Sequence, residues 1–85
     1  MKLNENFELR QVADTWVVLP VGQTSVDFNG MLTLNESGAL LWKALENGTD
    51  PVDALTAEYE VSRSQAAADV EEFLDSLRKI GCLEE

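Results

Sequence analysis

The segment NGMLTLNESGALLW, residues 29–42, joins a strand-like pattern to a helix start with no loop between them. Asn35 has an acceptor side chain of the kind preferred at the residue that caps a helix. Glu36 follows it and suits the positive end of the helix dipole. The helix is therefore predicted to begin directly after Leu34, which fixes the last strand against the helical half of the chain.

The residues before this junction predict three strands within residues 7–34. Residues 7–12 alternate apolar and polar side chains, and residues 16–20 are apolar and β-branched. Residues 25–34 form the third strand and contain Asn29-Gly30, which suits either a tight hairpin turn or a bulge because both need a positive φ. Few residues remain before the helix, so a bulged third strand is favoured over a fourth strand.

Three helices are predicted after the junction, over about residues 36–46, 51–60 and 62–80. Gly48 ends the first helix. Asp50 caps the second helix, and Pro51 stands at its first position, where a missing N–H costs nothing. Ser62 and Gln65 have the spacing of a capping box at the start of the third helix. Each helix thus has its own start signal.

Strands followed by helices predict an α+β fold, and short helices joined by tight turns indicate a winged helix-turn-helix with an N-terminal three-stranded antiparallel sheet. We expect one domain over residues 1–85. A chain of this length buries only about 60% of the surface that its unfolded form exposes, so most apolar side chains are needed for the core. Trp42 and Trp16 are predicted to be core residues.

The distribution of charge argues against nucleic-acid binding. The net charge is −10, and residues 35–85 contribute −8 of it. Binding to a phosphate backbone relies on cationic side chains that replace counterions. A winged-helix DNA-binding protein is kept as an alternative, although only Arg63, Arg78 and Lys79 are basic on the helix that would read the DNA.

Residues for catalysis, metal binding or cofactor binding are scarce. The chain has no histidine and one cysteine, Cys82, so a Cys–His or Ser–His pair cannot form. Glycine-rich phosphate loops and calcium-binding loops are also missing. We therefore expect no enzymatic activity, no cofactor and no metal, and we expect the thiol to be unreactive.

Asp75-Ser76-Leu77 suggests a second alternative, because it resembles the phosphopantetheine attachment site of acyl carrier proteins. In that family the serine opens a central helix. Here Ser76 lies deep in the last predicted helix, and the strands before Asn35 have no counterpart in an all-helical carrier.

No apolar run approaches the ~20 residues that are needed to cross a bilayer. The first ten residues lack the basic-then-apolar order of a secretory signal. A cytoplasmic protein without membrane contact is expected.

Three segments in this order resemble the PqqD-like family, named after pyrroloquinoline-quinone synthesis protein D: LTLNESGALLW, LENGTDPVDALTAEYEVS and AAADVEEFLDSLRKIGCLE. The resemblance covers about residues 7–84. Its most specific parts are Leu34–Gly38, the aromatic Trp42 that follows, Glu58-Tyr59, and the apolar series that leads to Gly81 and Leu83.

The resemblance implies a RiPP recognition element, a domain that binds the leader of a ribosomally made precursor peptide. Such domains present the peptide to a modifying enzyme, frequently a radical S-adenosylmethionine (SAM) protein. In the family the leader adds as a strand to the third strand and lies against the third helix. Whether the product is pyrroloquinoline quinone or another peptide product stays open, as does the choice between a monomer and a strand-exchanged dimer.

Strand addition needs a free sheet edge and pockets for alternate side chains. Residues 26–34 suit this role because they lack the Lys and Pro that normally protect an edge. The predicted peptide-binding residues lie on the third strand and the third helix: Phe28, Met31, Leu32, Thr33, Asp69, Val70, Phe73, Leu74 and Leu77. The sequence does not separate the apolar residues that line the groove from those in the core.

Overall fold

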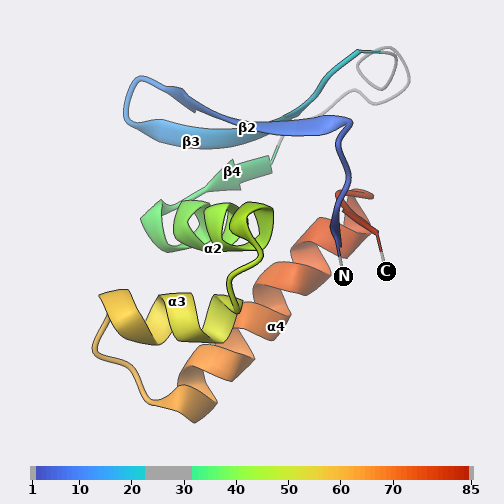
Figure 1. Ribbon diagram of the computed structural model, residues 1–85. Coiled ribbons are helices and arrows are strands. Elements are labelled where there is room, and N and C mark those ends of the chain that lie inside the picture. The colour runs from blue at the N-terminus through green and yellow to red at the C-terminus, as the bar shows by residue number, and fades with distance from the viewer. Residues whose placement is uncertain (1, 23–31, 85) are drawn as a thin grey trace.

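A computed structural model describes residues 2–22 and 32–84. Its elements are, in chain order, β1 (Lys2–Leu3), β2 (Phe7–Val12), β3 (Thr15–Pro20), β4 (Leu32–Leu34), α2 (Glu36–Asn47), α3 (Pro51–Glu58), α4 (Arg63–Lys79) and β5 (Leu83–Glu84). A sheet of β2, β3 and β4 lies above a layer of helices, with α2 next to the sheet and α4 running diagonally away from it (Figure 1). The predicted α+β fold, an antiparallel three-stranded sheet followed by three helices, is confirmed and is compatible with a winged helix-turn-helix.

The sheet has the order β2-β3-β4, so β4 lies at one edge. Its register pairs Trp16 with Leu34 and Val18 with Leu32. These residues share the face toward the helices, where Val18 and Leu34 are buried, while Thr33 between them is exposed. In the described part of the chain β4 pairs with β3 alone, and its other edge has no strand partner there. The predicted bulge at Asn29-Gly30 lies outside the described residues.

The predicted caps start all three helices. The Asn35 side chain accepts a hydrogen bond from the Gly38 N–H at 2.8 Å, and Asp50 accepts from two N–H groups in the first turn of α3. Ser62 accepts from the Gln65 N–H at 3.1 Å. The reciprocal half of the capping box is absent, because the Gln65 side chain donates to Asp69 at 2.9 Å instead of returning to Ser62.

The second helix ends two residues earlier than expected. Helix α3 stops at Glu58, and Tyr59 has an extended backbone with ψ 147°. Tyr59 therefore lies outside the helix that was predicted to include it and is 42% exposed. This early end places the tyrosine ring at the mouth of the site described below.

The core consists of two clusters under the sheet and between the helices. Trp42, Leu77, Val18 and Cys82 are the largest side chains that are fully buried. The predicted core position of Trp42 is confirmed, whereas Trp16 is only half-buried, with the Lys43 Nζ at 4.3 Å from its ring centroid.

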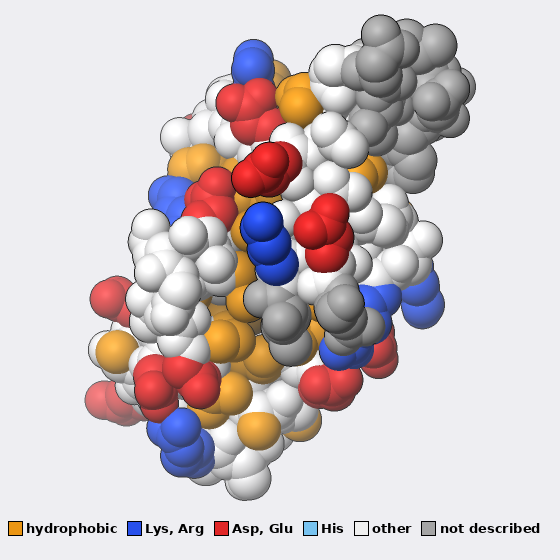
Figure 2. Space-filling model, turned by 45° about the vertical axis from the view of Figure 1, so that its right-hand side comes forward, with side chains coloured by type: hydrophobic (Ala, Val, Ile, Leu, Met, Phe, Trp, Pro, Cys, Tyr) orange, Lys and Arg blue, Asp and Glu red, His pale blue; other side chains and the backbone are white. Residues whose placement is uncertain are grey.

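A second, two-stranded sheet joins the ends of the described chain. Strand β1 pairs antiparallel with β5, which places Leu3 opposite Leu83. The sequence did not predict this pairing, because strands of two residues show no periodicity. Figure 2 shows a face on which hydrophobic side chains gather in the lower middle part, with both acidic and basic side chains around them. No described helix is long and apolar enough to cross a membrane.

Candidate functional site

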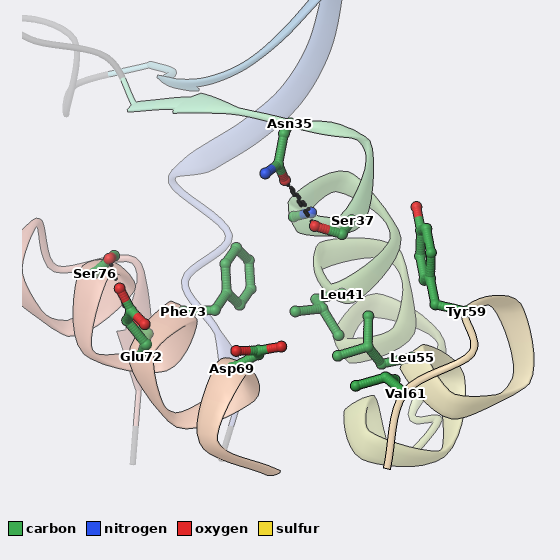
Figure 3. A pocket seen from close by; sticks show the side chains of 11 residues that line it. Asn35, Ser37, Leu41, Leu55, Tyr59, Val61, Asp69, Glu72, Phe73 and Ser76 are labelled. Carbon is green, nitrogen blue, oxygen red and sulfur yellow. Dashed lines mark hydrogen bonds between the residues drawn. The ribbon is translucent and has the colours of Figure 1, made fainter. Parts of the chain in front are cut away.

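An open groove of about 550 Å³ begins where β4 ends and lies between α2, α3 and α4 (Figure 3). Helix α4 forms one wall, and the start of α2 with the end of α3 forms the other. The lining residues are Asn35, Ser37, Gly38, Leu41, Leu55, Tyr59, Val61, Asp69, Glu72, Phe73 and Ser76. The floor is therefore apolar and the rim polar, which is the usual composition of a ligand-binding site.

The periodicity of α4 decides which of its residues face the groove. Val70, Leu74 and Leu77 are at most 4% exposed and belong to the core. The groove wall comes from the adjacent stripe, in which Asp69 lies four residues before Phe73 and Glu72 lies four residues before Ser76. One helix thus supplies both the packing and the wall.

Phe73 lies at the boundary between the core and the groove. It is half-buried, packs against both core clusters and lines the groove. In Figure 3 its ring points from α4 into the space below Asn35. A side chain in this position can provide an apolar contact for a ligand without a change in the core.

The start of α2 is packed closely against the end of β4 at position 38, so an added side chain would require its neighbours to move. A Cβ added to Gly38 would lie 3.2 Å from the Leu34 Cβ and 3.3 Å from the Asn35 Oδ1. The same Oδ1 also accepts a hydrogen bond from the Ser37 Oγ at 2.9 Å. The LNESG segment therefore connects strand to helix and at the same time forms the upper end of the groove.

The structure divides the predicted site residues into three groups. Asp69 and Phe73 line the groove, whereas Val70, Leu74 and Leu77 are core residues that do not line it. On β4, Leu32 is half-buried against the core and Thr33 is exposed on the other face. Phe28 and Met31 lie outside the described residues.

Sequence reasoning missed the whole wall opposite α4 and two lining residues of α4 itself. A helical projection centred on Phe73 would have found Glu72 and Ser76, because they lie on the same face as Asp69. No local signal could have found Tyr59 and Val61, because they reach the groove only through the early end of α3 and the packing of α3 against α4.

The residues that line the groove include few side chains of the types that catalyse reactions or bind metals. Its lining contains no His, Cys, Lys or Arg. Within residues 2–22 and 32–84, no three His, Cys, Asp or Glu side chains come together as metal ligands. Burial in the core raises the pKa of the Cys82 thiol to about 12, and this residue is not part of the groove lining. The arrangement is suited to holding an extended chain between a helix and a strand edge that has no strand partner in residues 2–22 and 32–84.

The chain is similar in sequence and fold to known proteins. The sequence model of the family described as coenzyme PQQ synthesis protein D (PqqD) matches residues 15–83. The solved structure of TbiB1 in complex with the TbiA(beta) leader peptide is 29% identical, with a TM-score of 0.80 over 99% of this chain and 95% of that chain. A structure of lasso peptide synthetase B1 complexed with the leader peptide is 28% identical, with a TM-score of 0.80 over 99% of this chain and 96% of that chain. A search of curated proteins finds no match.

Proposed function

The chain belongs to the PqqD family, and from that premise we propose that it is a non-catalytic domain that binds the leader of a ribosomally made precursor peptide. The observation that carries this proposal is the groove that begins at the end of β4, which has no strand partner on its outer edge among the described residues. Support comes from two structures of similar sequence and fold that are complexes with leader peptides.

The leader is proposed to add to β4 as a further strand. Its main chain would exchange hydrogen bonds with the edge of Leu32–Leu34 that faces away from β3, and its alternate side chains would turn toward the groove. The cap at Asn35 holds the end of β4 in place before binding. Less conformational entropy is then lost when the peptide adds to the edge. The apolar floor would take one or two apolar side chains of the leader.

The class of the modifying enzyme is a separate and more specific proposal. The family resemblance suggests a radical SAM enzyme, whereas the similar solved structures are described as lasso peptide synthetase B1 and TbiB1. We favour an enzyme of lasso peptide synthesis, because these relatives match the chain over nearly its whole length. We propose that the 85-residue domain acts in the cytoplasm, where precursor peptides are made. The genes beside this one distinguish the two classes of enzyme.

The two alternatives find little support in the described residues. On α4, Arg78 pairs with Glu71 and Asp75, and Arg63 pairs with Asp53 across to α3. These cations are therefore compensated by carboxylates that would repel DNA. Ser76 lies within α4, with its Oγ donating to the Glu72 carbonyl at 3.2 Å. It is not at a helix start, where an acyl carrier has its serine.

Titration of the ¹⁵N-labelled protein with a synthetic leader from an adjacent short reading frame tests the proposal. We expect micromolar binding, with amide shifts concentrated on residues 32–34 and on the groove face of α4. Phe73→Ala should weaken binding, and Val12→Ala is the matched control, because Val12 is an exposed apolar residue on β2. Shifts confined to the exposed face of α3, or no binding by any adjacent precursor, would refute leader recognition at this site.

A further inference from the structure

We infer that the groove selects a Lys or Arg side chain in its peptide, placed beside an apolar side chain that contacts Phe73. This inference rests on the proposed function and specifies the chemistry of the same site. Its basis is the difference between the carboxylates of α4 that line the groove and those that do not.

The carboxylates of α4 outside the groove are compensated by an arginine. The Arg78 Nη1 lies 3.0 Å from the Glu71 Oε1 and 2.8 Å from the Asp75 Oδ1. Neither Glu71 nor Asp75 lines the groove. One cation of the protein thus already serves both of these acidic residues.

The two carboxylates that line the groove have no such cation. Neither Asp69 nor Glu72 is in an ion pair with another described residue. Asp69 accepts a hydrogen bond from the side-chain amide of Gln65, which is neutral and leaves the negative charge uncompensated. Ser76 donates to the main-chain carbonyl of Glu72, so its hydroxyl does not compensate the carboxylate either.

The position of these carboxylates fits a long cationic side chain. Figure 3 shows Asp69 and Glu72 projecting from the α4 wall near the Phe73 ring. The methylene groups of a Lys or Arg could lie against this ring while the charged group reaches the carboxylates. Arg could in addition form a bidentate pair with one carboxylate. An acidic guest side chain would meet uncompensated charge of its own sign, so the same wall also excludes unsuitable peptides.

A positional-scanning library of synthetic dodecapeptides tests the inference on the full chain. We expect the wild-type protein to enrich Lys or Arg at one position, next to or two residues from an enriched apolar position. Asp69→Asn and Glu72→Gln should each reduce binding of a selected basic peptide about threefold, as expected for a partly exposed ion pair. Glu71→Gln is the matched control, because this carboxylate is on the same helix and is held by Arg78 outside the groove.

The possible results separate this inference from the proposed function. Apolar enrichment with amide shifts in the groove, but no preference for Lys or Arg, would overturn the charge selection and leave peptide binding intact. A basic preference that Glu71→Gln removes as strongly as Glu72→Gln would also overturn it, since the attraction would then be that of the whole acidic helix. No binding by any library peptide would count against the proposed function itself.

Discussion

Replacing Gly38 by alanine tests how closely the edge strand is held against α2. The added Cβ would lie 3.2 Å from the Leu34 Cβ and 3.3 Å from the Asn35 Oδ1, inside the 3.5–4.0 Å at which carbon atoms normally attract each other. Neither neighbour moves easily. Leu34 is 8% exposed in the core, and the Asn35 Oδ1 is held by the Gly38 N–H at 2.8 Å.

Two opposing effects determine the size of the change. Alanine favours a helix over glycine by about 1 kcal/mol. Overpacking costs about 1–3 kcal/mol, and loss of a helix cap costs about 1 kcal/mol more. The net expectation is a loss of about 1–3 kcal/mol in the free energy of unfolding. For a domain of this size that lowers the melting temperature by about 5–20 °C.

Thermal and urea unfolding of Gly38→Ala, Asn35→Ala and the double variant measure this effect. If the new methyl group breaks the cap, Asn35→Ala should cost clearly less in the Gly38→Ala background than in the wild type, because the cap is lost only once. A melting temperature raised by Gly38→Ala would refute the reasoning. It would mean that Leu34 and Asn35 move aside at little cost, so that the gain in helix propensity exceeds the cost of overpacking.

Three further predictions concern the edge strand, α4 and the buried thiol. Where the Thr33 N–H faces away from β3, Thr33→Pro removes one backbone donor from the outer edge of β4 and should weaken leader binding about tenfold, whereas Thr33→Val should bind like the wild type; equal binding by both variants in calorimetry would then contradict strand addition. Leu77→Ala should lower the free energy of unfolding by about 3 kcal/mol in urea because Leu77 is fully buried, whereas Phe73→Ala should cost less stability and more affinity. The pKa of Cys82 is raised from 9.0 to about 12, so the native state retains a proton that the unfolded state loses in this range, and stability should fall as the pH rises from 9 toward 12. Cys82→Ala should show a smaller fall between pH 8 and pH 10.5 in urea unfolding, and an unchanged pH dependence would contradict this assignment.

Much of the fold could be predicted because its signals are local. A cap forms between residues two or three positions apart, so Asn35, Asp50 and Ser62 could be recognised in the sequence as helix starts. The second hydrogen bond of the capping box, which does not form, shows the limit of such signals. Gln65 had a second partner one turn further on, and only the folded helix shows that its amide donates to Asp69.

The candidate site was harder to predict, because its walls come from separate elements. The apolar stripe of α4 was recognised, but its division into core and groove depends on what packs against each side. Val70 and Leu74 contact the cluster that holds Leu41 and Leu55, while Phe73 is left at the boundary. A periodic pattern gives the direction of a side chain and not the element that it meets.

By itself, the sequence determined the order of strands and helices, the starts of the helices, and the abrupt join between strand and helix at Asn35. These features depend on backbone preferences and hydrogen bonds between near neighbours. Only the tertiary structure decided that the join would open a groove, because Tyr59 and α4 reach it from distant parts of the chain. It also decided that Asp69 and Glu72 line the groove, because α2 and α3 lie on the other side of that face of α4. Arg78 compensates Asp75 and Glu71 within α4 itself, and helix periodicity specifies contacts of this kind. Packing between distant segments decides only which of the remaining carboxylates face a groove.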